Sequence, residues 1–395
     1  MTYLEETRAA GREIFPDLAR AFALIGIALV NVAIFSHPMM TGYTDLQGAD
    51  QWAYFGVNSL FLLKSYTLFS FMFGVGFAYQ MMAAERRSVG FAGRYWRRIL
   101  GLLILGLLHV ALAFQGDILV IYAILGCFLF LFRKSSAKTL IRWGIGLYAV
   151  QFLIVLLGLG FFWMGATFAP EQMAAEMETS AAAADAARQA FGEGSFADAA
   201  VQRFVDWSMV LVGGLFMQGI GAMAFFVFGL AAVRYEAISN PRKPIWKTFR
   251  RFFLPIGVAG SVWGGWLMAS SGSGMMSVDM LAGMTVITLF SPFSTAGYLG
   301  LIAKWAEKPE GRIKIFLARG GTASLTAYIL QSVLFSLIFN NYGLGLYDEV
   351  GAFVSIAIAL VVGFGSIAVA SLWRIRFSRG PLEVLLRGWT YLGAR

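Results

Sequence analysis

The chain has 395 residues, of which 58% are hydrophobic and only 13% are charged, whereas soluble domains average about 25% charged residues. So few charged side chains cannot cover the surface of a soluble protein of this length, which excludes an ordinary soluble enzyme, a disordered chain and a nucleic-acid-binding domain. The net charge of +9 is therefore assigned to basic loops of a membrane protein, and no nucleic-acid partner is expected. The single cysteine, Cys127, excludes an intramolecular disulfide, and the two histidines form no Cys/His cluster that would predict a metal site.

Apolar runs between clusters of charged residues predict an all-α polytopic integral membrane protein. A transmembrane helix needs about 20 predominantly apolar residues. Ten runs approach this length, and together they form a single transmembrane domain of residues 1–395. In chain order they cover approximately residues 18–35, 54–79, 99–114, 118–132, 141–164, 208–233, 252–269, 280–303, 322–339 and 350–373.

The connections between these segments alternate in charge. Those on one side carry most of the lysine and arginine residues, whereas those on the other side carry only Arg188 and Arg203. One further basic residue, Lys64, lies within the second segment. Because basic loops remain in the cytoplasm, the alternation predicts that both termini are cytoplasmic and that the number of spans is even.

One long connection, residues 165–207, lies on the outer side and is rich in alanine and acidic residues. Pro170 suits the first turn of a helix. Ser195 and Asp198 have the spacing of a capping box that would start a second helix. We interpret this segment as an extracytoplasmic helical hairpin insertion that is solvated on the outer face. A lid over an outward-facing cavity is the alternative.

Residues 380–395 form a second segment outside the predicted spans. Gly380 and Pro381 begin a short helix there. The apolar side chains on one side of this helix are Leu382, Leu385, Leu386 and Trp389. An amphipathic helix of this kind lies in the membrane interface, so we expect a structural role for it.

Four polar side chains are predicted at membrane depth on the first four segments. At a rise of ~1.5 Å per residue, His109 and Asn31 each lie about 16 Å from the inner basic boundary, near the midplane. Lys64 and Asp117 share a level closer to the outer face. Ionisable groups inside a bilayer are costly and mark function. Because a buried ammonium group needs a partner, we predict an ion pair between Lys64 and Asp117.

Each of these polar residues also has a purely structural interpretation. Asp117 precedes the fourth segment, where aspartate is favoured as a helix N-cap. Lys64 can extend to the outer interface, and His109 can be a neutral core imidazole that binds a carbonyl. Asn31 can join two helices. The second histidine, His37, follows the first segment and is expected in a surface loop.

A stripe of polar side chains spaced four residues apart follows the ninth segment. Such spacing places the side chains on one helix face. They are Ser324, Tyr328, Ser332, Ser336 and Asn340. This stripe is either a helix-packing surface or the wall of a water-filled tunnel.

The chain contains no convincing internal repeat. Residues 71–74 and 226–229 share the pattern Phe-x-Phe-Gly and are predicted to run in the same direction through the membrane. Four residues are weak evidence for a duplication.

Arginine residues crowd the inner loop between the second and third segments. They are Arg86, Arg87, Arg94, Arg97 and Arg98. They can act as a topology signal alone or form an anion-binding mouth for a donor that carries phosphate groups.

Several sequence blocks together resemble one family. They are residues 18–31 (LARAFALIGIALVN), 64–76 (KSYTLFSFMFGVG), 106–119 (GLLHVALAFQGDIL), 325–332 (LTAYILQS), 342–346 (YGLGL) and 380–383 (GPLE). These blocks are similar to those of the YeiB-like bacterial inner-membrane proteins, the domain of unknown function 418. The family looks like a branch of the transmembrane acyltransferases. The resemblance implies a location in the bacterial inner membrane and a reaction that moves an acyl group from cytoplasmic acyl-CoA to an acceptor at the periplasmic face.

If the resemblance holds for the reaction, His109 is the general base or transient acyl carrier. Asn31 then orients His109 or binds the carbonyl oxygen. Lys64 and Asp117 form the polar pair on the acceptor side. Arg20, Arg97 and Arg98 bind the phosphates of acyl-CoA, the co-substrate. A weaker version of this hypothesis assigns the chemistry to His37.

Two alternatives from other classes remain open at this level. One is a transporter or permease whose midplane polar groups bind a small solute. The other is a non-catalytic membrane assembly protein. For the acyltransferase, the expected partners are the lipid bilayer and a small-molecule or glycan acceptor, and a homodimer is compatible with the sequence.

Overall fold

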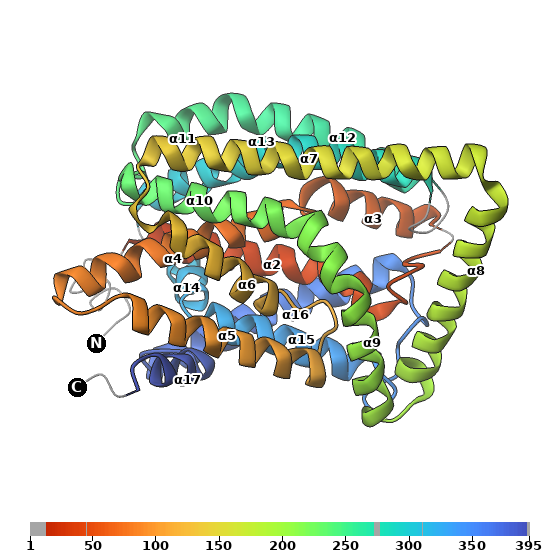
Figure 1. The fold of residues 1–395 in the computed structure, drawn as a ribbon. Helices are drawn as coiled ribbons and strands as arrows, with labels where there is room; N and C mark the ends of the chain where they lie inside the picture. Colours follow the sequence, from red (N-terminus) through yellow and green to blue (C-terminus); the bar gives the residue numbers. More distant parts are fainter. Residues whose placement is uncertain (1–12, 45, 272–276, 310, 393–395) are drawn as a thin grey trace.

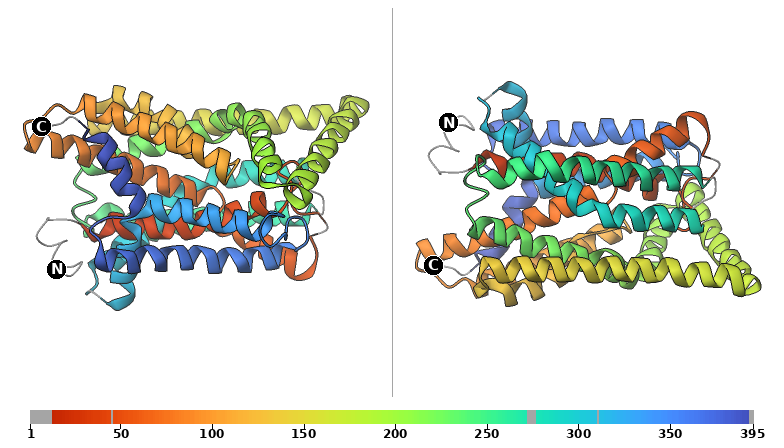
Figure 2. Two further views of the ribbon diagram at one scale, coloured as in Figure 1. Left: turned by 90° about the horizontal axis from the view of Figure 1, so that it is seen from below. Right: turned by 90° about the horizontal axis from the view of Figure 1, so that it is seen from above.

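The computed structural model describes residues 13–44, 46–271, 277–309 and 311–392. Within these ranges the chain forms helices and turns and has no β-strand. Most of the long helices lie side by side along one direction (Figure 1), and the two further views agree (Figure 2). The helix α2 begins, and the helix α17 lies, at the same end of the bundle.

The helices have the following bounds in chain order. They are α2 (Ile14–Ser36), α3 (Gly48–Leu60), α4 (Lys64–Arg86), α5 (Ala92–Leu112), α6 (Leu119–Leu129), η1 (Phe130–Lys134), α7 (Ala137–Phe168), α8 (Pro170–Ala187), η2 (Arg188–Glu193), α9 (Phe196–Gly214), η3 (Leu215–Gly219), α10 (Ile220–Arg234), α11 (Pro244–Thr248), η4 (Phe249–Phe253), α12 (Leu254–Ser270), α13 (Val278–Glu307), α14 (Arg312–Gly321), α15 (Ser324–Phe339), α16 (Ala352–Arg376) and α17 (Pro381–Thr390).

The described residues contain eight helices that are long and apolar enough to cross a membrane. A ninth crossing results if α14 and α15, which meet at an angle of 83°, count as one broken span. Each of the ten predicted segments contains a helix, but the segment of α6 and η1 is shorter than a full span. The fold is therefore that of an all-helical, multi-pass membrane protein. Of the basic residues that indicated its orientation, Arg8, Arg12 and Arg395 lie outside the described ranges.

The second predicted segment is interrupted, whereas the sequence predicted one continuous helix over residues 54–79. The helix α3 ends at Leu60 and α4 begins at Lys64. Leu63 between them has a φ of 64°, in the left-handed region that a leucine rarely adopts. Such a conformation costs about 1–3 kcal/mol and persists only where packing enforces it.

The two Phe-x-Phe-Gly motifs form the crossing of α4 and α10. A side-chain carbon at Gly74 would overlap the carbonyl oxygen of Phe226, and one at Gly229 would overlap the carbonyl oxygen of Phe71. Phe73 stacks on Phe226 with 4.4 Å between ring centroids. Each motif thus supplies the glycine that the other motif's backbone requires. Their similarity has a packing reason, because small residues let membrane helices approach closely.

The outer connection folds into the helices α8 and α9, which project at the end of the bundle opposite α17 (Figure 1). Pro170 is at the first position of α8. The predicted capping box at the start of α9 is confirmed, because Ser195 and Asp198 exchange side-chain and backbone hydrogen bonds. The backbone N–H of Asn341 donates to the carbonyl of Phe191 at 2.8 Å. This bond connects the segment between α8 and α9 to the loop after α15.

The C-terminal helix α17 holds the start of α15. The Glu383 carboxylate accepts hydrogen bonds from the backbone N–H of Leu325, at 2.7 Å, and from the Thr326 hydroxyl, at 2.6 Å. The indole of Trp389 donates to the carbonyl of Arg97 at 2.8 Å. Glu383 therefore satisfies donors at a helix N-terminus that would otherwise lack partners.

The glycine crossing predicts opposite effects for two neighbouring substitutions on α4. Gly74→Ala should lower the free energy of unfolding by about 1–3 kcal/mol, because the added methyl group meets backbone. Gly76→Ala should raise it by up to ~1 kcal/mol, because no atom lies within 4 Å of the added methyl group. Thermal unfolding of both variants in detergent checks this. Equal stability of the two variants would contradict the proposed crossing.

Candidate functional site

A buried histidine–aspartate pair lies where α5 turns into α6. The Nδ1 atom of His109 is 2.6 Å from Oδ2 of Asp117, and the two side chains are 1% and 0% exposed. The other carboxylate oxygen of Asp117 accepts the backbone N–H of Val120 at 2.8 Å. Asp117 therefore binds the first turn of α6 from the position before the N-cap residue, Ile118, and binds His109 at the same time.

Gly106 makes this arrangement sterically possible. It lies one turn before His109 on α5, and a side-chain carbon there would lie 2.8 Å from both Oδ1 of Asp117 and the backbone nitrogen of Val120. Contacts this short do not occur for real side chains, so the turn can approach α5 only where this position is glycine.

The predicted ion pair between Lys64 and Asp117 is wrong. Lys64 is buried, but its ammonium group donates to the backbone carbonyl of Asn58 at 3.4 Å. Both oxygens of Asp117 are engaged by His109 and Val120. Equal depth along the membrane normal does not by itself bring two side chains together.

The second nitrogen of the His109 ring has no hydrogen-bond partner. Its Nε2 atom is buried, and so is the Tyr328 hydroxyl, which also lacks a partner. The two rings lie edge to face with centroids 5.1 Å apart. With the Nδ1 proton donated to Asp117, Nε2 carries the lone pair that a general base uses.

The surroundings of His109 are closed in this conformation. The residue is 4% exposed, and the rings of Phe114 and Tyr328 cover it. Neither of the two cavities described for this structure is lined by His109. A substrate can therefore reach Nε2 only after one of these rings or the turn at Gly116 moves.

The other predicted site residues on the first helix do not join this pair. Asn31 is half-buried on α2, and no hydrogen bond links it to His109 in the described part of the chain. Arg20 forms an ion pair with Asp17 at 2.9 Å. Arg20 lies in the second turn of α2, at the opposite end of this helix from His37.

The two remaining predicted arginines lie at the start of α5. Arg97 donates to the backbone carbonyl of Leu392, which follows α17. Arg98 lies within electrostatic range of Arg20 and Glu383. Arg20 and Arg98 therefore lie near each other at the inner end predicted from charge. In the described residues, no group of three or more His, Cys, Asp or Glu side chains could hold a metal ion.

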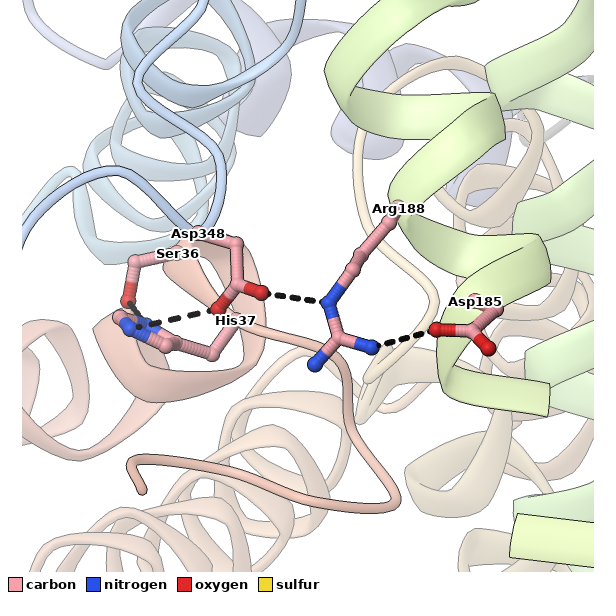
Figure 3. A network of polar contacts seen from close by, with 5 residues as sticks. All are labelled: Ser36, His37, Asp185, Arg188 and Asp348. Carbon is pink, nitrogen blue, oxygen red and sulfur yellow. Dashed lines mark hydrogen bonds and ion pairs between the residues drawn. The ribbon is translucent and has the colours of Figure 1, made fainter. Parts of the chain in front are cut away.

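His37 is buried, not in an exposed loop as the sequence predicted. It is 7% exposed at the end of α2, where its Nδ1 atom lies 2.9 Å from the Ser36 hydroxyl. Its Nε2 atom is 3.6 Å from the carboxylate of Asp348. Figure 3 shows Arg188 reaching from the outer hairpin to this carboxylate at 2.6 Å, and to Asp185 at 2.7 Å. Residues from distant parts of the sequence thus cover His37.

Burial lowers the pKa of His37 below its ordinary value of 6.5, and the nearby carboxylate of Asp348 opposes this shift. The Arg188 guanidinium lowers the pKa further, whereas Asp50 raises it. The Arg188 pKa is raised, chiefly by its hydrogen bond to Asp348. His37 is therefore neutral over a wider pH range in the folded protein than in the unfolded chain.

Sequence reasoning missed a buried arginine on α9, at the end of the site that faces the helical hairpin. Arg203 on α9 is 1% exposed, and its Nε atom donates to the carbonyl of Ala111 at 3.4 Å, two residues after His109. Its Nη1 atom donates to the Tyr342 hydroxyl at 3.2 Å, and its Nη2 atom has no partner. The available signal was its position, because Arg203 was one of only two basic residues in the connections predicted on the outer side.

The predicted polar stripe on α15 connects these features. Tyr328 faces His109, and one turn further on, Ser332 donates to the Tyr328 carbonyl at 3.4 Å. Ser336 forms a hydrogen bond with Tyr342, which in turn accepts from Arg203. A buried polar path therefore runs along α15 from the His109 pair to the outer arginine.

The fold and its buried polar groups define a multi-pass helical membrane protein. A model for the family described as "Protein of unknown function (DUF418)" matches residues 232–393. The uncharacterized protein YxaH of Bacillus subtilis (strain 168) is 30% identical over 99% of this chain and 97% of its own length. The uncharacterized protein YeiB of Escherichia coli (strain K12) is 25% identical over 97% of both chains. No solved structure matches.

The chain therefore belongs to the YeiB-like DUF418 family, as the sequence blocks predicted.

The lowered pKa of His37 predicts a pH dependence of stability. Below pH 6.5 the unfolded chain binds a proton at His37 before the folded protein does, so the free energy of unfolding falls as pH decreases through this window. His37→Gln should remove this component. Thermal unfolding of the wild type and the variant in detergent, at about pH 7.5 and about pH 5.5, checks this. Both proteins have the same carboxylates, so the contribution of the carboxylates to the pH dependence cancels in the comparison. The same loss of stability in the variant and in the wild type would contradict the prediction.

Proposed function

We propose that this protein is a membrane-embedded acyltransferase that moves an acyl group from cytoplasmic acyl-CoA to an acceptor at the periplasmic face. The observation that carries this proposal is the buried His109–Asp117 pair with an unpartnered Nε2 atom. A histidine whose other nitrogen is held by a carboxylate has the arrangement of a general base. The resemblance to transmembrane acyltransferases supplies the reaction class.

In this proposal, Nε2 of His109 removes the proton from an acceptor hydroxyl group. The acceptor oxygen then attacks the thioester carbonyl carbon, and the carbon–sulfur bond breaks. The proton on Nε2 passes to the departing thiolate of CoA, which restores the neutral ring. Asp117 is a positioning residue, because its carboxylate holds Nδ1–H and stabilises the imidazolium formed during transfer.

The proposal also assigns the two ends of the bundle to the two sides of the membrane. Ten segments cross the bacterial inner membrane, and both termini are cytoplasmic. This orientation is supported by the common end at which α2 begins and α17 lies (Figure 1), and by the alternation of charge. Arg20, Arg97 and Arg98 at that end bind the phosphates of acyl-CoA. The polar path along α15 leads from the acceptor at the outer face to His109.

The closed surroundings of His109 favour a second candidate function. A non-catalytic membrane assembly protein would use the His109–Asp117 pair only to fix the turn between α5 and α6. In that case the pair would never open to a substrate, which agrees with the 4% exposure of His109 in this structure.

Incubation of the purified protein with radiolabelled acyl-CoA tests the enzymatic proposal. The wild type should release CoA, with the label transferred to an acceptor, to water or to the protein. His109→Ala should lower the rate by roughly 10²–10⁴-fold, the usual contribution of a general base. Asp117→Asn should lower it by at least about tenfold and shift its pH profile, because the tautomer of His109 is no longer fixed. His37→Ala is the matched control and should retain the wild-type rate.

A full rate in His109→Ala would exclude this assignment. The absence of CoA release and of label transfer in the wild type would favour the assembly protein. Solute uptake into proteoliposomes without any requirement for acyl-CoA would favour a transporter.

A further inference from the structure

A groove of about 390 Å³ opens on one side of the bundle. It lies between α2, the break that separates α3 from α4, and α13. Phe22, Leu60 and Leu301 form an exposed rim, whereas Lys64 and Leu68 are buried. Its volume is within the range of ~300–1,000 Å³ that is common for ligand sites. Because the lining helices are membrane-spanning, the groove opens to the lipid phase.

The hydroxyl groups that line the groove are already engaged. The Tyr298 hydroxyl donates to the carbonyl of Leu60 at 2.9 Å. The Ser65 hydroxyl donates to the carbonyl of Phe61 at 3.0 Å. Both bonds satisfy backbone groups at the break between α3 and α4, so these hydroxyls have little capacity to hold a ligand.

Lys64 is different, because its ammonium group has donors to spare. The group has three N–H donors, and its one hydrogen bond is the long contact of 3.4 Å to the carbonyl of Asn58. Lys64 is 1% exposed. No aspartate or glutamate in the described ranges forms an ion pair with it. Burial penalises the charged form of such a lysine, so an anionic partner is what would keep its ammonium group charged in a membrane-spanning region.

We propose that this groove binds a long-chain fatty carboxylate. The carboxylate pairs with the ammonium group of Lys64, and the hydrocarbon chain packs along Phe22 and Trp305 towards the lipid. A carboxylate fits better than a phosphodiester headgroup, because the lining has one cation and no arginine or amide side chain for further oxygens. Ser65, next to Lys64, packs directly on Gly26 of α2.

This binding site is separate from the site of the proposed acyl transfer. Neither His109 nor Asp117 lines the groove. The inference therefore does not depend on the proposed acyl transfer, and a failure of one leaves the other intact.

Binding of radiolabelled palmitate to the purified full-length protein in detergent, at about neutral pH, tests the inference. Methyl palmitate keeps the chain and lacks the charge. We expect saturable binding of palmitate that is at least roughly tenfold tighter than binding of methyl palmitate. Lys64→Met should weaken palmitate binding at least about tenfold and leave methyl palmitate unchanged, whereas Lys64→Arg should restore most of the affinity.

Indirect effects are controlled by matched variants: Lys138→Met is the control for Lys64→Met, and Leu289→Trp is the control for Leu301→Trp. Lys138→Met removes an exposed lysine on α7 and should bind palmitate as the wild type does. Leu301→Trp fills the groove from its exposed rim and should weaken the binding of both probes. Leu289→Trp, an equally exposed position on α13 outside the groove lining, should change neither.

Equal affinities for palmitate and methyl palmitate that Lys64→Met leaves unchanged would overturn the inference and indicate an ordinary lipid chain in the groove. An absence of saturable palmitate binding to the wild type would overturn it too. If Lys64→Met does not fold, the preference of the wild type for palmitate and the contrast between Leu301→Trp and Leu289→Trp decide the question. Unchanged palmitate binding in Leu301→Trp would then contradict the proposed site.

Discussion

The arrangement of the candidate active site depends on one carboxylate, that of Asp117, held between the ends of two helices. One oxygen accepts the Val120 N–H that starts α6, and the other binds His109 in the last turn of α5. A buried ionisable group is costly unless hydrogen bonds surround it. These two bonds therefore couple the course of the backbone to the orientation of the imidazole. The requirement on the sequence is Gly106, where any side chain would overlap the carboxylate.

The sequence predicted those features that local patterns determine. All ten apolar segments contain helices, and the capping box of Ser195 and Asp198 is present, because hydropathy and capping act within a few residues. It did not predict which side chains meet across the bundle. Helical rise gives depth along the membrane normal but no lateral position, so it placed Lys64 with Asp117. The burial of His37 depends on Asp348, far along the chain, and was missed for the same reason.

The two exceptions to the charge alternation share one explanation. Arg188 and Arg203 both lie on the outer hairpin, and both bind the loop between α15 and α16, through Asp348 and Tyr342 respectively. Their charges are used in contacts that attach the hairpin to the bundle. The hairpin therefore covers the outer end of the polar path along α15. In the proposed mechanism this is the side from which the acceptor arrives.

The tautomer of His109 is the most direct test of the central claim. The chain has only two histidines, so ¹⁵N-histidine labelling of the His37→Gln variant leaves His109 as the one imidazole observed by nuclear magnetic resonance. The account predicts a protonated Nδ1 and an unprotonated Nε2 at neutral pH, and a loss of this preference in the double variant with Asp117→Asn. A protonated Nε2 in the protein that retains Asp117 would contradict the assignment of His109 as a base.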